Sequence, residues 1–372
     1  MLTTQIIDSW ESFQSLAQTW NHLWERSQSH VAFHRAEPIC HFVEAFDLKD
    51  SLRVVLVRSG DQLVTAVPLT LRRRSIGGVG GIGGWEAQSL ANEWLIQACL
   101  LDLPVGNPAA RMEALNAGFQ QLNLSRVKLD WLPLDWPAQR RLMDHWRQRR
   151  RVWAKPRFEV HKMLVPKDWE AYYRDVAKST KKTIQRSKNQ LSQKGPIAIE
   201  EVSRESIDEF EMAFHQALQI EHAGWKGADG SSLSSYPRIA DFYRRSFLQL
   251  AQQGLARLYF LKVGNQRIAF DLGYTAAGVY SSIKVSYLPE FSKFSPGNLL
   301  NGLLLEQFSQ TREVEWIDCI GPATDSTRRW TDTNYVSGRL TLSTGSLISN
   351  AEVMLLNTAA NWLGKNSLPP VH

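Results

Sequence analysis

The stretch that decides the fold is LARLYFLKVGNQRIAFDLGYTAAGVYSSIKVSYLPEFSKFSPGNLLNGLLLEQFSQ, residues 255–310. Three apolar and aromatic runs, 255–263, 267–275 and 279–286, are separated by the short turn sequences GNQ and AG, a pattern typical of a strand meander. From Ser295 onward, leucines recur at helical spacing. We therefore predict three consecutive strands, then a loop and an amphipathic helix.

The start of that helix has the composition of an anion site. Ser295 suits the N-cap, and Pro296 suits the first helical position, where its missing N–H is not needed. Gly297 lets a ligand approach the bare backbone. Because the first amides of a helix lack intrahelical acceptors, those of Gly297, Asn298 and Leu299 are expected to bind an anion, with phosphate as the obvious candidate.

Composition limits the class of protein. With 372 residues, of which 43% are hydrophobic and 14 are Trp, the chain is expected to form two domains with sizeable cores. Its three cysteines, Cys40, Cys99 and Cys319, fit neither a disulfide framework nor a zinc cluster, and no metal is predicted. We see no signal peptide and no apolar run near the ~20 residues of a membrane helix, so a soluble, cytoplasmic protein is expected.

The positive charge is concentrated in one block. Between Arg140 and Lys194 there are 17 Lys/Arg against 5 Asp/Glu, whereas the whole chain has a net charge of +6. An electropositive groove for nucleotide phosphates, an anionic polymer or RNA is one interpretation. The other, which we favour, is a solvated helix, because Val176, Ile184 and Leu191 form a regular apolar stripe among the lysines.

The predicted elements form two halves with loosely similar order. We predict domains at 1–160, 161–345 and 346–372, the last being a C-terminal helix and tail. The fold class is α/β with a mixed α+β sheet, in which each half has a central, mostly antiparallel sheet flanked by helices. In the first half we expect strands at 5–7, 52–58, 62–71 and 127–131, and helices at 13–24, 41–46, 109–122 and 139–148.

The glycine run at 77–84 contains a formal Gly-x-Gly-x-x-Gly. A dinucleotide site needs a parallel βαβ unit around this motif, whereas a hairpin strand ending in 72–74 precedes it here. We therefore expect a flexible surface loop.

The order of strands, Ser-Pro-Gly element and helix resembles the core of the GNAT acyltransferases. Within that superfamily the chain is most similar to the branch linked to exopolysaccharide and cellulose biosynthesis, through the segment 316–322 followed by Arg329-Trp330. The resemblance covers about residues 160–345. The chain departs from the usual GNAT motif, Gln/Arg-x-x-Gly-x-Gly/Ala, in two ways. Phe294 replaces the polar residue that opens the motif, and only one glycine remains. Two GNAT-like halves in tandem also resemble the Fem-type transferases.

This resemblance implies acyl-coenzyme A as co-substrate and direct acyl transfer to an amine or hydroxyl. Such chemistry needs a base for the acceptor, polarisation of the carbonyl and help for the leaving thiolate. The catalytic candidates are Glu221, Asp271, His215 and Tyr335. The cofactor-binding candidates are Ser286, Ser295, Gly297, Asn298 and Leu299, and the substrate-binding candidates are Trp225, Lys284, Asp318, Arg329 and Trp330.

Several of these residues have a structural alternative. Strand alternation leaves Asp271 facing either a cleft or solvent. His215 is either catalytic or a packed or capping residue, and Trp225 is either a sugar-stacking face or core. Arg329 is either a ligand contact or a solvated loop residue. Tyr335 either protonates the departing thiolate or packs in a strand.

Three functions follow from these observations. The first is an acyl-coenzyme A transferase, most simply an acetyltransferase, acting on a sugar, amino-sugar or related polysaccharide precursor. The second is a Fem-type transferase that uses aminoacyl-tRNA, and the third is a non-catalytic GNAT-like binding module. The sequence does not distinguish oligomeric states.

Overall fold

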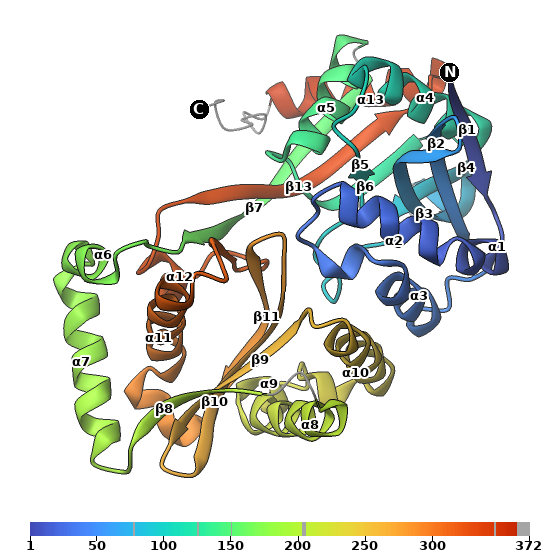
Figure 1. The fold of residues 1–372 in the computed structure, drawn as a ribbon. Coiled ribbons are helices and arrows are strands. Elements are labelled where there is room, and N and C mark those ends of the chain that lie inside the picture. The colour runs from blue at the N-terminus through green and yellow to red at the C-terminus, as the bar shows by residue number, and fades with distance from the viewer. Residues whose placement is uncertain (77–78, 125, 150, 203–205, 346, 363–372) are drawn as a thin grey trace. The chain divides into compact units, whose positions relative to one another are not determined.

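The structure is a computed structural model that describes residues 1–372 except 77–78, 125, 150, 203–205, 346 and 363–372 (Figure 1). The chain separates into two compact units. The first contains Met1–Ser29, Phe33–Glu159 and the segment that begins at Tyr335, and the second contains His30–Ala32 and Val160–Asn334. The predicted limit at residue 345 therefore differs from the unit boundary, because the strand that starts at Asn334 pairs with a strand of the first unit.

The first unit alternates strands and helices. Its strands are β1 (Leu2–Ile7), β2 (Leu52–Ser59), β3 (Gln62–Ile76), β4 (Val79–Ser89), β5 (Leu101–Asp102), β6 (Arg126–Pro133) and β13 (Asn334–Ser343). Its helices are α1 (Trp10–Ser15), α2 (Ala17–Arg26), η1 (Ala32–His34), α3 (Ala36–Ala45), α4 (Pro108–Gln121), α5 (Pro137–Gln148) and α13 (Leu347–Trp362). The single helix predicted over 13–24 is thus two helices that meet at Leu16.

The sheet of this unit has the order β1-β2-β3-β4-β6-β13, with β5 beside β3. β4 and β6 are parallel, and the other described pairs are antiparallel. The surface loop predicted at 77–84 is wrong from residue 79 onward, since β4 pairs there with β3, while Gly77 and Gly78 lie outside the described residues. The pairing energy of a long hairpin outweighs the low strand propensity of glycine.

The second unit begins within β7 (Val152–Leu164), which was not predicted. Its other strands are β8 (Ile197–Glu201), β9 (Ala256–Val263), β10 (Gln266–Ala276), β11 (Val279–Tyr287) and β12 (Trp316–Asp318). Its helices are α6 (Trp169–Asp175), α7 (Lys178–Ser192), α8 (Ile207–Ala223), α9 (Trp225–Ala228), η2 (Leu233–Ser235), α10 (Pro237–Gln252), η3 (Pro289–Phe294), α11 (Pro296–Thr311) and α12 (Asp325–Arg328).

The predicted meander is confirmed. β9, β10 and β11 pair antiparallel in sequence order, and the sheet continues as β7-β12-β11-β10-β9-β8. Figure 1 shows α8 and α10 on one side of these strands and α7 and α11 on the other. As in the first unit, two strands separated by a helix run parallel, here β11 and β12. The mixed α/β class is confirmed.

The core under α11 explains the helical spacing of its leucines. Leu299, Leu300, Leu304 and Phe308 are buried against the sheet and against α7. The predicted stripe is confirmed too, since Ile184 and Leu191 of α7 and Val176, just before it, belong to the same core. The Lys and Arg side chains of α7 are exposed or half-buried around this stripe. Burial of each large aliphatic side chain contributes about 1.5–3 kcal/mol.

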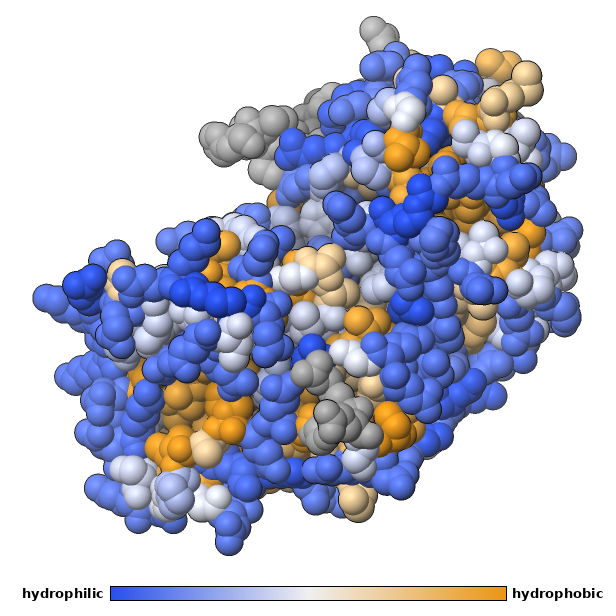
Figure 2. Space-filling view, viewed as in Figure 1, coloured by the Kyte–Doolittle hydropathy of each residue, from blue (hydrophilic) through white to orange (hydrophobic). Residues whose placement is uncertain are grey.

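The face of the molecule in Figure 2 is predominantly hydrophilic, with separate apolar patches. Among the described residues, no helix has the length and apolarity needed to cross a bilayer.

Candidate active site

The two parallel strands of the second unit separate soon after they meet. β11 pairs with β12 only from Val279 to Ser281, although β11 continues to Tyr287. Beyond this point no described strand pairs with that edge of β11. A β-bulge lies at the same place, because Leu272 pairs with Lys284 and Gly273 with Ser282, which leaves Ile283 as the extra residue. The local sheet therefore opens and presents unpaired backbone.

The N-terminus of α11 borders this opening. The amide of Leu299 donates to the carbonyl of Ser295 at 3.1 Å, so the predicted set of three free amides reduces to those of Gly297 and Asn298. Ser295 is the N-cap residue, but it is left-handed, with φ of 49°, and its side chain makes no capping hydrogen bond. The helix end is thus left without a side-chain cap. A Cβ at Gly297 would meet no atom within 4 Å.

A pocket of about 330 Å³ occupies the opening, and we call it the central pocket. Its volume is at the lower end of the range for small-molecule sites. The apolar wall consists of Met163, Ile283, Val285, Leu304 and Ile317. The polar wall consists of Lys226, Asp271, Ser282, Asn301, Thr324, Ser326 and Thr327, and Gly297, Cys319, Gly321 and Pro322 complete the lining.

Asp271 is the buried carboxylate of this pocket. It is 2% exposed, which resolves the choice between cleft and solvent. The hydroxyls of Tyr280 and Ser282 donate to its Oδ1 at 2.7 and 2.8 Å, and no described residue donates to Oδ2. Burial raises the pKa of Asp271 to about 6, against the lowering effect of the two hydrogen bonds. One oxygen is therefore oriented, and the other remains available to accept a proton near neutral pH.

Glu221 lies outside the lining of the central pocket. Its Oε1 accepts from Lys226 Nζ at 3.2 Å and its Oε2 from the amide of Leu233 at 2.9 Å, while Lys284 Nζ lies 3.8 Å away. Both oxygens are thus engaged. Burial lowers the pKa of Lys284 to about 8, and the nearby Lys226 adds to this effect. Glu221 holds Lys226 at the pocket instead of facing it as a free base.

Cys319 and Asp318 follow each other at the end of β12. Cys319 lines the pocket, but burial, assisted by Asp318 and Asp271, raises the pKa of its thiol well above the usual range, so the reactive thiolate is not favoured. Asp318 is fully buried and is not part of the lining. Its Oδ1 accepts from the amide of Ile320 at 2.9 Å, and its Oδ2 is 3.2 Å from His30 Nε2. It stabilises the turn after β12.

Trp330, a predicted substrate-binding residue, belongs to the core of the second unit. It is 4% exposed, and its Nε1 donates to Asn298 Oδ1 at 2.8 Å. A Cβ on Gly302 would lie 2.6 Å from its ring, so this glycine allows the close approach of indole and helix. The neighbouring Arg329 is exposed and lines a different pocket.

The remaining predicted residues lie away from the lining of the central pocket. His215 is exposed on α8, and Ser286 is half-buried on β11. Trp225 is 68% exposed, which excludes the core interpretation, and it directly precedes Lys226. Tyr335 belongs to the first unit, where its hydroxyl accepts a hydrogen bond from Gln97 at 2.8 Å.

Sequence reasoning missed the polar residues Lys226, Ser282, Asn301 and Thr327. Asn301 could have been found, because it lies one helical turn after Gly297 and shares its face. Lys226 and Thr327 come from short segments outside the strands, and no periodic signal marks them. In the described part of the chain, no group of three His, Cys, Asp or Glu side chains is arranged to hold a metal ion.

Comparison with known proteins agrees with this geometry. Residues 178–328 match the family model of the acetyltransferase (GNAT) domain. The match contains the meander, α11 and β12, and hence most of the central pocket. No curated protein matches the sequence.

Solved structures resemble the whole chain. The structure of FemX has a TM-score of 0.55 at 11% identity, covering 91% of this chain and 98% of that one. The C-terminal domain of a protein described as a lysylphosphatidylglycerol synthetase, from Agrobacterium fabrum, has 0.54 at 9% identity, covering 94% and 96%. L-PGS from Bacillus licheniformis has 0.50 at 10% identity, covering 95% and 96%. At these identities the similarity shows the fold alone. Residues 178–328 thus have a GNAT-like acyltransferase fold, and the chain as a whole shares the fold of these solved structures.

Proposed function

We propose that the second unit is an acyl-coenzyme A transferase that acts on an amine or hydroxyl of a small polar acceptor. The observation that carries this proposal is the meeting, in one pocket, of an uncapped helix N-terminus, an opened strand edge and the buried carboxylate of Asp271. An acyl transfer of this kind needs an anion site, a groove for an extended chain and a base.

The residues present fit the donor. The free amides of Gly297 and Asn298 would hold its pyrophosphate, with open space at Gly297 for a close approach. The apolar wall around Val285 and Ile317 suits the pantetheine arm, and the unpaired backbone at the Ile283 bulge offers hydrogen bonds to its amides. When bound, acyl-coenzyme A supplies a thioester carbonyl. Transfer of an acetyl group is our specific proposal.

Asp271 is the proposed general base. Its Oδ2 takes the proton of the attacking amine or hydroxyl as the bond from acceptor to acyl carbon forms and the carbon–sulfur bond breaks. Tyr280 and Ser282 keep the carboxylate oriented through Oδ1. Glu221 becomes a positioning residue that acts through Lys226, and the role of Tyr335 as proton donor to the thiolate stays a prediction.

For the acceptor we propose a sugar or amino sugar, of the kind used in polysaccharide synthesis. Support comes from the exposed indole of Trp225, which sits beside the pocket residue Lys226 and offers a flat apolar face of the type that stacks on sugar rings. His215 and Asp318, by their positions, are not proposed to contact it.

Calorimetric titration of acetyl-coenzyme A into the wild type and Gly297→Val tests the proposal. A Cβ at this position meets no atom within 4 Å outside the neighbouring helix backbone, so the packing is kept, whereas the branched side chain of valine would cover the amides. We expect the wild type to bind and the variant to lose at least tenfold in affinity, about 1.4 kcal/mol. Equal affinity in both proteins would contradict the donor site.

The similarity to FemX favours a second candidate, a Fem-type transferase that uses aminoacyl-tRNA. The basic segment 140–194 is compatible with an RNA partner. A thermal-shift comparison of acetyl-coenzyme A with charged tRNA separates the two. Stabilisation by charged tRNA and not by acetyl-coenzyme A would replace the first candidate with the second. No stabilisation by either would favour a non-catalytic module.

A further inference from the structure

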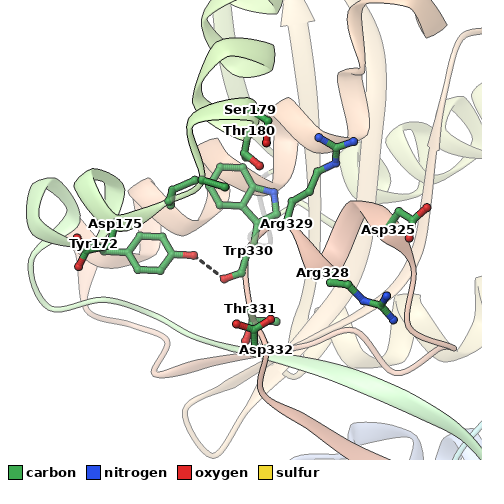
Figure 3. A pocket seen from close by; sticks show the side chains of 12 residues that line it. Tyr172, Asp175, Ser179, Thr180, Asp325, Arg328, Arg329, Trp330, Thr331 and Asp332 are labelled. Atoms are coloured by element: carbon green, nitrogen blue, oxygen red, sulfur yellow. Dashed lines mark hydrogen bonds between the residues drawn. The ribbon is translucent and has the colours of Figure 1, made fainter.

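A second hollow lies in the second unit, on the other side of α12 from the central pocket. α12 contributes Ser326 and Thr327 to the central pocket, but Asp325 and Arg328 to this one. Its volume is about 630 Å³, and its other walls come from the start of α7 and from residues 329–332 (Figure 3). We call it the arginine pocket, after Arg328 and Arg329.

The start of α7 has amides that no side chain caps. The amide of Lys181 makes the first intrahelical bond, to Ala177, so the amides of Lys178, Ser179 and Thr180 have no acceptor among the described residues. The N-cap, Ala177, has no side chain that could cap them, and the first turn has no acidic residue. Instead, the first residues of α7 include Lys178, Lys181 and Lys182. The helix dipole is positive at this N-terminus and disfavours cations there.

A buried hydroxyl points to a ligand independently of the helix end. Thr180 is 1% exposed, lines the arginine pocket, and makes no side-chain hydrogen bond to any described residue. The next threonine of the helix, Thr183, donates normally to the carbonyl of Ser179 at 2.9 Å. Because Thr180 lines the pocket, its hydroxyl is placed to hydrogen-bond a ligand there.

The lining contains two guanidinium groups, of Arg328 and Arg329, and three carboxylates, of Asp175, Asp325 and Asp332. In Figure 3 the guanidinium of Arg329 lies on the same side of the pocket as Ser179 and Thr180, whereas the three carboxylates lie apart from these two hydroxyls. Neither Arg328 nor Arg329 forms an ion pair with a described residue. The wall is also held in place, because the hydroxyl of Tyr172 donates to the carbonyl of Trp330 at 2.6 Å.

From these contacts we infer that the arginine pocket binds a phosphate or pyrophosphate group of a small ligand, through the α7 amides, Thr180 and Arg329. The site is separate from the proposed donor site at α11 and does not depend on it. A small ligand is favoured over a nucleic acid because the pocket lacks a free aromatic face: Tyr172 and Trp330 are engaged with each other and with the core.

Titration of inorganic phosphate and inorganic pyrophosphate into the full chain tests this inference. The wild type should bind pyrophosphate, and Thr180→Val and Arg329→Gln should each weaken binding about 10- to 100-fold, the effect of losing one hydrogen bond to a charged group. Thr183→Val is the matched control in the same helix and should bind as the wild type does. All four proteins should keep the same affinity for acetyl-coenzyme A.

The exposed position of Arg329 makes its variant informative even where Thr180→Val fails to fold. Failure of the wild type to bind either anion at millimolar concentration would overturn the inference. So would pyrophosphate binding that both variants retain, because that binding would belong elsewhere. An RNA that binds more tightly than pyrophosphate and loses its binding in Arg329→Gln would assign the pocket to nucleic acid and overturn the small-ligand assignment.

Discussion

The phenol of Tyr280 donates a 2.7 Å hydrogen bond to Oδ1 of Asp271, and both residues are buried. The two residues come from adjacent antiparallel strands, β10 and β11. Burial and the neighbouring carboxylate raise the pKa of Tyr280 well above the usual range, so it stays a donor. Oδ1 of Asp271 is thus fixed by a hydrogen bond to the neighbouring strand, and Oδ2 is left to accept a proton.

Replacing Asp271 with Asn should abolish most of the acyl transfer. The Asn Oδ1 still accepts from Tyr280 and Ser282, so the fold is kept while the base is lost. Loss of a general base typically lowers the rate by about 10² to 10⁴. Turnover with any acceptor that proves active, measured together with acetyl-coenzyme A affinity, checks this. The matched control is Cys319→Ala, which lines the same pocket and should keep near-full turnover. Wild-type turnover in Asp271→Asn would show that another group is the base.

The same carboxyl should make stability depend on pH. Its pKa of about 6 in the folded protein is above the ordinary value of 3.8, so the folded state binds the proton more tightly than the unfolded chain does. Its stabilising contribution is complete below about pH 4, decreases as pH rises toward 6 and is lost above that, a change on the order of 3 kcal/mol. The difference in unfolding free energy between wild type and Asp271→Asn should follow this curve, with the variant more stable at pH 7. A pH-independent difference would refute it.

Activity should depend on pH in the opposite direction. A base must be deprotonated to act, so kcat/KM should rise through about pH 6 and then level off. A pH–rate profile with a saturating concentration of donor measures this. An unchanged profile in a Ser282→Ala variant, which loses one of the two hydrogen bonds that lower the pKa, would argue against Asp271 as the titrating group.

Two glycines of α11 should respond differently to alanine. Gly302→Ala brings a methyl group into the ring of Trp330 and should destabilise the protein by about 1–3 kcal/mol. Gly297→Ala meets only open space and should be neutral, or stabilising by up to about 1 kcal/mol through its helix propensity. Chemical denaturation of both variants gives the comparison. The close packing of Trp330 on α11 would be disproved by equal stability of the two.

The cations around the buried stripe of α7 should not contribute to donor binding. Neutralising Lys181, Lys182, Arg186 and Lys188 together leaves the buried stripe of the helix intact, so acetyl-coenzyme A affinity should stay unchanged. Should the chain bind tRNA through this helix, tRNA affinity would fall steeply with salt, and the four changes would flatten that slope. Affinity measured at several salt concentrations distinguishes these outcomes, and a strong slope lost in the variant would favour the Fem-type function.

Local sequence determined the elements of this protein where pattern and packing agree. Periodicity predicts the meander, the leucine face of α11 and the stripe of α7. The apolar residues of a strand or helix with one buried face recur at a period of two or of about 3.6 residues. The turn sequences GNQ and AG set the hairpins, and Pro296 sets the start of α11. The glycine run failed as a prediction because its residues from Val79 onward form the second strand of a hairpin with β3, and this pairing stabilises an extended conformation that glycine does not favour by itself.

Only the tertiary structure decided which polar residues share a site. Asp271, Lys226 and Thr327 are far apart in sequence, and their meeting depends on how strands, α9 and α12 pack around the opening beside β11. Strand alternation alone allows the side chain of Asp271 to face either a cleft or solvent. In the structure it is buried beside the bulge at Ile283, and the hydroxyls of Tyr280 and Ser282 orient it. Glu221 looked equivalent to it by composition, yet two lysines and an amide engage it. Burial and hydrogen bonding, which set the chemistry of a carboxylate, are properties of packing between distant segments and not of local sequence.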